Sequence, residues 1–166
     1  MAAVTGHGEH ALAPPAALRA RRTAAPLVAA LLSLGAAWVH LAYTASHLRQ
    51  WWAYGAFFLA TGVLQATLGV LLLWRPRAWM ALIAIPGNLA IVAMYVVSRT
   101  SGPPLGPHAH VPEAAGAVDL ATTGAEIALV GVLLTLLGGR SRRWVANLLL
   151  AGGVLLWALR LSGRLP

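Results

Sequence analysis

The sequence has no cysteine and no lysine, and only four of its 166 residues are acidic. Without cysteine, the chain has no disulfides, thiolate metal sites or iron–sulfur clusters. Charged residues make up 10% of the chain, against about 25% in soluble domains. The sequence also lacks the glycine-framed serine of many hydrolases, the phosphate-binding P-loop and the glycine-rich dinucleotide fingerprint. These absences argue against a soluble enzyme of any of those classes.

Hydrophobic residues make up 59% of the chain. They form five stretches of roughly 20 residues, the length that crosses a hydrocarbon core of about 30 Å. We therefore predict an all-α, polytopic transmembrane helix bundle over residues 26–166, preceded by a disordered tail over residues 1–25. The five expected spans cover about residues 26–47, 53–74, 78–98, 118–137 and 144–161, with one long loop over residues 99–117.

Two alternatives to this layout stay open. Residues 144–159, between Arg143 and Arg160, give the fifth span only 16 residues free of charge, so a four-span core with an interfacial last helix is possible. The stretch RARRTAAPLVAALLSLGAA also fits a cleaved export signal, with a basic start, an apolar run and small residues. Cleavage there would leave His40 near a new terminus.

The arginines predict the orientation of the bundle. Eight of the twelve fall on the side of the N-terminal tail and four on the other, and positive charge stays in the cytoplasm. We therefore expect a bacterial inner (plasma) membrane protein with a cytoplasmic N-terminus and an external 99–117 loop. The net charge of +8 reflects these span ends, so we expect the lipid bilayer and other membrane subunits as partners, and no nucleic acid.

Ionisable residues recur at the same spacing in the first and fourth spans. His40 and His47 are seven residues apart and share a helix face, and so do Asp119 and Glu126. The two spans run in opposite directions, so His40 matches Glu126 in depth and His47 matches Asp119. A carboxylate near mid-bilayer costs about 2.5–3.5 kcal/mol and normally faces a partner inside the bundle. We predict that the first and fourth helices pack together through these two pairs.

The long loop adds a second group of candidate ligands. In GPHAHVPE, four nearby prolines favour an extended backbone, which would point His108 and His110 the same way. Imidazoles with carboxylates bind divalent transition metals, so zinc, copper or iron is the expected cofactor. The candidate metal ligands are His40, His47, His108, His110, Glu113, Asp119 and Glu126. Arg99 is expected to neutralise Glu113 or Asp119.

Other polar and small residues in the spans favour structural roles. Gln65 and Asn88 are expected to form hydrogen bonds between helices, with Asn88 close to a kink at Pro86. Both span histidines are on one helix, which argues against a haem held between helices. We expect the glycines to allow close approach of helices at positions 62, 69, 131, 152 and 153.

Four sequence stretches carry a resemblance to a known family. They are WWAYGAFFLATGVLQ, GN at 87–88, SRTSGPPLGP at 98–107, and a proline–glutamate pair followed by an aspartate and a glutamate over 112–126. Over residues 30–137 the chain resembles a family of small, uncharacterised multi-pass membrane proteins from actinobacteria and related bacteria. The resemblance implies the same topology and the same polar residues, and it implies no particular reaction.

Three functional hypotheses follow. The first is an outward-facing site of histidines and carboxylates that binds a divalent transition metal or relays protons. The second is a non-catalytic membrane subunit or scaffold whose buried polar pairs only hold the bundle together. The third, an oxidoreductase or hydrolase built on the same residues, lacks a complete catalytic set in the sequence, so no catalytic residue is assigned.

Overall fold

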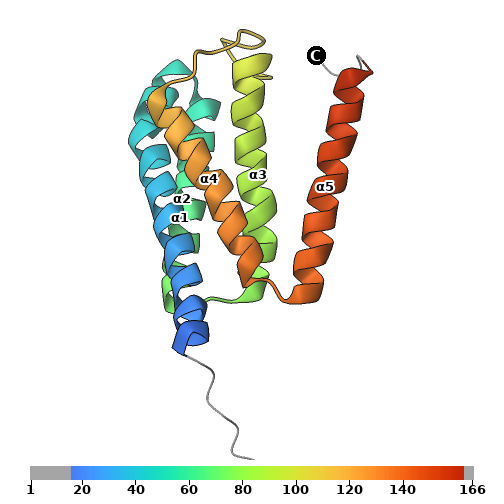
Figure 1. Ribbon diagram of the computed structural model, residues 1–166. Coiled ribbons are helices and arrows are strands. Elements are labelled where there is room, and N and C mark those ends of the chain that lie inside the picture. The colour runs from blue at the N-terminus through green and yellow to red at the C-terminus, as the bar shows by residue number, and fades with distance from the viewer. Residues whose placement is uncertain (1–15, 163–166) are drawn as a thin grey trace, which may run out of the picture.

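The computed structural model describes residues 16–162, with the side chains of residues 24–158 and 161–162. This part of the chain is all-helical, as the sequence predicts. Figure 1 shows the helices as antiparallel rods, with the long loop at one end, called the loop end below. Their bounds are α1 Ala16–Gln50, α2 Trp52–Trp74, α3 Ala78–Thr100, α4 Ala117–Leu136 and α5 Gly139–Leu161.

The apolar runs set these boundaries closely. Within the described residues, four helices are long and apolar enough to cross a membrane: the 24–50 part of α1, and α2, α3 and α4. These four spans confirm the membrane-protein prediction and its four-span core. Helix α5 also forms, but whether it crosses the membrane stays a prediction.

Helix α1 starts before the first expected span. It begins at Ala16, ten residues before the expected start of that span, and the extent of the disordered tail stays a prediction. The stretch before Pro26 is rich in alanine and arginine, both strong helix formers. The first 15 residues lie outside the described part of the chain.

Helices α1, α2, α3 and α4 form the compact part of the bundle. The packing of α1 on α2 is the most extensive, and α4 packs on both α1 and α3. Helix α5 stands apart and touches the bundle chiefly near the end of α4 (Figure 1). The apolar core lies in the half of the bundle away from the loop end, around Leu72, Ile85, Leu129 and Leu133.

Glycines at a seven-residue spacing explain the close α1–α2 contact. Gly55, Gly62 and Gly69 of α2 all lie directly against α1. The expectation for Gly62 and Gly69 is confirmed, and Gly55 is a third member that it missed. An added Cβ at Gly131, Gly152 or Gly153 would meet no heavy atom of the described chain within 4 Å, so no close helix contact uses those three glycines.

Gly55→Ala should therefore destabilise the bundle. A Cβ at this position would lie 2.8 Å from the Leu48 Cα, so the two backbones must separate, at a cost of about 1–3 kcal/mol for overpacking. Gly131→Ala is the matched control and should be neutral or stabilising by up to about 1 kcal/mol. Thermal unfolding of the purified variants in detergent measures both. Equal unfolding temperatures for the two variants would contradict the close α1–α2 contact.

Candidate functional site

A buried polar cluster links the four core helices near mid-membrane. Its six buried polar side chains are Ser33, His40, Thr61, Gln65, Asn88 and Glu126. Glu126 is 1% exposed, and residue 126 is the tenth of the twenty residues that α4 spans from 117 to 136. Burial among helices keeps this carboxyl group out of the lipid, where it would be costly.

Gln65 is the hub of the cluster. Its side-chain Nε2 donates to Asn88 Oδ1 at 3.1 Å and to Glu126 Oε1 at 3.0 Å. Its backbone carbonyl accepts from the Ser33 hydroxyl at 2.6 Å. Asn88 Nδ2 in turn donates to the Ala84 carbonyl within α3. Gln65 of α2 is thus hydrogen-bonded to α1, α3 and α4, and the interhelical role predicted for Gln65 and Asn88 is confirmed.

His40 faces Glu126 across the α1–α4 contact, as the sequence spacing predicts. Its Nε2 lies 3.8 Å from Glu126 Oε1. This distance is longer than a hydrogen bond, but it is short enough for the two groups to interact electrostatically. The other ring nitrogen, Nδ1, lies 3.0 Å from the Ala36 carbonyl oxygen. A carbonyl only accepts, so Nδ1 carries a hydrogen and the neutral ring presents a lone pair on Nε2 to the carboxyl group.

The second predicted pair, His47 with Asp119, is wrong. The His47 ring stacks on Phe58, with centroids 3.6 Å apart, and its Nδ1 lies 2.9 Å from the Tyr43 carbonyl oxygen. Asp119 instead binds Arg99, whose Nη2 lies 2.9 Å from Asp119 Oδ2. Equal depth was not sufficient to pair the two residues, because the Arg99 guanidinium at the end of α3 forms a charge-assisted hydrogen bond with the Asp119 carboxylate.

Arg99 ties the loop to α3 and α4. Its Nη1 donates to Glu113 in the loop while Nη2 holds Asp119 at the start of α4. The guanidinium also lies over the Tyr95 ring, 5.0 Å from its centroid. Asp119 Oδ2 additionally accepts from the Gly116 backbone N–H at 3.0 Å, which caps α4. The expectation that Arg99 neutralises one of these acids is confirmed for both.

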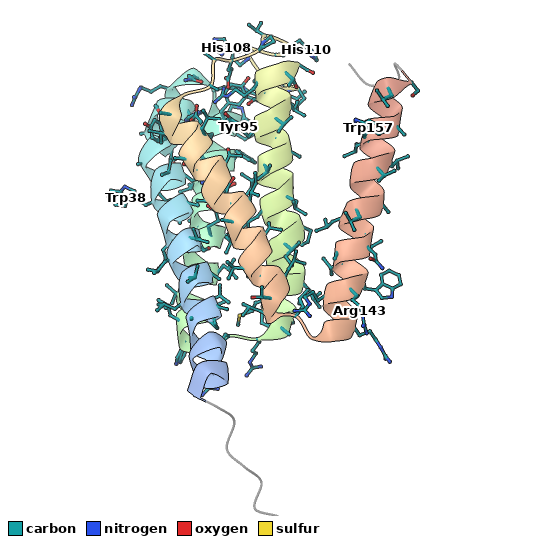
Figure 2. The ribbon with its side chains drawn as sticks, viewed as in Figure 1. Trp38, Tyr95, His108, His110, Arg143 and Trp157 are labelled. Atoms are coloured by element: carbon teal, nitrogen blue, oxygen red, sulfur yellow. The ribbon has the colours of Figure 1, made fainter. Side chains whose placement is uncertain are left out.

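The loop histidines lie away from the other candidate ligands. The loop does not run extended: backbone hydrogen bonds join Ala109 to Gly106, His110 to Pro103 and Val111 to His108, and His110 has a positive φ of 61°. His108 and His110 are exposed on these turns at the loop end (Figure 2). The chain turns at Gly106 and His110, so the extended H-x-H prediction is wrong.

The seven predicted metal ligands therefore do not form one metal centre. Among the described residues, no group of three or more histidines, aspartates and glutamates is placed to hold a metal ion. Glu113 and Asp119 are paired with Arg99, and His47 is stacked on a phenyl ring. The donor set does not fit a zinc, copper or iron ion, and of the two predicted histidine–carboxylate pairs only His40–Glu126 forms.

A cavity of about 270 Å³ connects this pair to the loop end. His40 and Glu126 lie at its mid-membrane end, and Arg99, Glu113 and Asp119 lie at its loop end. Its walls carry five aromatic side chains, Trp51, Tyr54, Phe57, Phe58 and Tyr95, the last projecting from α3 toward the other helices (Figure 2). Pro103, Pro104 and Leu105 of the loop lie over it, and the Tyr54 hydroxyl donates to the Leu105 carbonyl at 2.7 Å.

Sequence reasoning did not predict this cavity. The sequence did carry one signal for it, the helical spacing of aromatic residues: Trp51, directly before α2, and Tyr54 and Phe58 within α2 recur on one face. Ser33 was missed too, although it lies seven residues before His40 on the same face of α1.

We predict that Arg99→Gln loosens the loop without unfolding the bundle. Glutamine cannot bind two carboxylates at once, so Glu113 and Asp119 lose their shared partner. Amide hydrogen exchange across residues 101–116 should become roughly tenfold faster, equivalent to about 1.4 kcal/mol. Exchange in the central turns of α2 should not change. Unaltered exchange in the loop would show that the ion pairs do not hold it.

Comparison with protein-family models, with curated proteins and with solved structures finds no match to this chain. The resemblance to the actinobacterial membrane family therefore stays a prediction.

Proposed function

We propose that this protein is a multi-pass membrane protein of the bacterial plasma membrane that holds an exchangeable proton on the His40–Glu126 pair. The carboxyl group is buried at mid-helix, and the imidazole presents an unprotonated Nε2 to it. A proton added to this pair binds either to His40 Nε2 or to the Glu126 carboxylate. Such paired ionisable residues inside a bundle mark proton sites in membrane proteins. The observation that carries the proposal is the 3.8 Å approach of His40 Nε2 to Glu126 Oε1.

The cavity supports exchange of this proton with one side of the membrane. It runs from the pair to the charged groups at the loop end. In the opposite direction, the space between the helices is filled by the buried side chains of Leu72, Ile85, Leu129 and Leu133, which offer no site for a proton or water. The arginine distribution favours a cytoplasmic N-terminus, so we assign the loop end to the external side.

A second function is favoured by the hydrogen bonds of Gln65. Because one side chain and its backbone carbonyl join all four core helices, Glu126 also acts as a structural acceptor. A non-catalytic subunit or scaffold needs no more than this. The two functions differ in whether Glu126 gains and loses a proton while the bundle stays folded.

Infrared difference spectroscopy across a pH titration distinguishes the two functions. A protonated carboxylic acid has a carbonyl stretching band that a carboxylate and an amide lack. We expect Glu126→Gln to fold normally, since its amide oxygen can still accept from Gln65, and to remove one titrating band. Glu113→Gln, at the exposed end of the cavity, is the control and should retain that band. A Glu126→Gln spectrum identical to wild type, together with a lowered unfolding temperature, would support the structural role instead.

The assigned orientation predicts a labelling pattern that the cysteine-free chain makes simple to measure. Pro107→Cys, Ser141→Cys and Ser162→Cys each introduce the only thiol of the chain, at an exposed position. In intact spheroplasts, a membrane-impermeant maleimide should label positions 107 and 162, and should label position 141 only after permeabilisation. Protection of position 107 would reverse the orientation. Protection of position 162 while position 107 is labelled would show that α5 does not cross.

A further inference from the structure

We propose that the loop-end cavity binds a small organic cation, a molecule with a compact apolar body and one positive charge. This deepens the proposed function, on which it rests through the shared use of Glu126. The cavity volume of about 270 Å³ lies just below the range of roughly 300–1,000 Å³ typical of ligand pockets. The occupant is therefore small.

The walls present aromatic rings to an occupant. Trp51, Tyr54, Phe57 and Phe58 line one side from the start of α2, and Tyr95 lines another from α3. The rings of Trp51 and Tyr54 lie edge to face, with centroids 5.1 Å apart and planes at 84°, so they offer surfaces in two orientations. Aromatic faces attract cations through the ring quadrupole, and several faces around one site are typical of quaternary ammonium recognition.

The charges around the cavity favour a cation over an anion. Three carboxyl groups line it, from Glu113, Asp119 and Glu126, and within the described residues one guanidinium does, that of Arg99. Arg99 already serves two of the carboxylates, although its Nε is buried with no hydrogen-bond partner. An anion that reached this Nε would sit beside Glu113 and Asp119 and be repelled.

The two histidines add acceptors to the same site. Each uses Nδ1 on a backbone carbonyl of its own helix, His40 on Ala36 and His47 on Tyr43. In the neutral rings Nε2 therefore bears a lone pair, which suits a positively charged or hydrogen-bond-donating ligand. A cation at the mid-membrane end meets Glu126, where it replaces the proton: the carboxylic acid releases H⁺ and becomes the counter-ion of the ligand.

An apolar opening provides access from the membrane. Phe57 of α2 and Met94 of α3 line the cavity and are also exposed on the bundle surface, at 37% and 38%. Helices α2 and α3 make little direct contact with each other, so their side of the cavity is the least closed. A cation with an apolar body concentrates at the membrane interface, near the loop end of this opening.

Binding is tested with three probes of matched shape. Benzyltrimethylammonium carries the charge, neopentylbenzene replaces its nitrogen by carbon, and benzylsulfonate reverses the charge. We expect isothermal titration calorimetry of the full chain in lipid nanodiscs, with empty nanodiscs as baseline, to show one site for benzyltrimethylammonium. The neutral and anionic probes should bind at least about tenfold more weakly. Equal binding of all three probes, or tighter binding of benzylsulfonate, would overturn the proposal.

Variants locate the site. Glu126→Gln should weaken benzyltrimethylammonium binding about tenfold or more, because it removes the counter-ion. Phe57→Leu keeps an apolar side chain at this position but removes one ring face, and should weaken binding about threefold. Trp38→Leu alters an aromatic residue that is 75% exposed and points away from the bundle (Figure 2), and should have no effect. Unchanged affinity in both Glu126→Gln and Phe57→Leu would place the probe elsewhere and refute the assignment.

Proton release separates this inference from the proposed function. In weakly buffered solution, at a pH where Glu126 carries its proton, binding of one benzyltrimethylammonium should release one proton from wild type and none from Glu126→Gln. The groups around Glu126 that also titrate or carry charge are His40 and His47 of α1, Arg99 of α3, Glu113 of the loop and Asp119 of α4. Binding without release would leave the cation site intact and contradict the exchangeable proton. A titrating Glu126 band without probe binding would refute the cation site alone.

Discussion

A carboxyl group at the middle of a membrane helix is the constraint on which the rest of this structure depends. Glu126 cannot face lipid without a cost of several kcal/mol, so α4 must turn this side toward α1, α2 and α3. The Gln65 amide supplies a hydrogen bond and the His40 ring lies beside it. Satisfying one acidic side chain thus sets the rotation of α4 and places residues from three other helices around it.

The same constraint divides the bundle into two halves. Away from the loop end, fully buried leucine and isoleucine side chains form the apolar core. The glycines of α2 allow α1 to approach closely along the whole α1–α2 contact. Toward the loop end, aromatic side chains and charged groups surround a cavity. Arg99 closes that end by joining the loop to α4. The first half contains the apolar core, and in the second half the cavity extends from Glu126 to the loop end.

The sequence was sufficient to predict the helices and the His40–Glu126 pair, since both follow from periodicity and from the cost of charge in lipid. The roles of Gln65, Asn88 and Arg99 were also predicted correctly, because few polar or charged partners lie at the same depth in the bundle as each of them. It failed where several partners compete. His47 and Asp119 match in depth, but Phe58 and Arg99 bind them more strongly. The course of the loop depends on turns at Gly106 and His110, which the proline content alone does not define. The cavity was not predictable either, because it depends on how α1, α2, α3, α4 and the loop pack together.

The central claim is that positions 40 and 126 meet inside the bundle, and crosslinking tests it most directly. In the cysteine-free chain, His40→Cys combined with Glu126→Cys introduces a single thiol pair, and Trp38→Cys combined with Glu126→Cys is the control on the outer face of α1. After treatment with a short thiol-bridging reagent and protease cleavage of the loop, the two fragments of the 40/126 variant should stay joined under denaturing conditions, and those of the 38/126 variant should separate. Separation of the 40/126 fragments, or joining of the 38/126 fragments alone, would contradict the arrangement of α1 and α4.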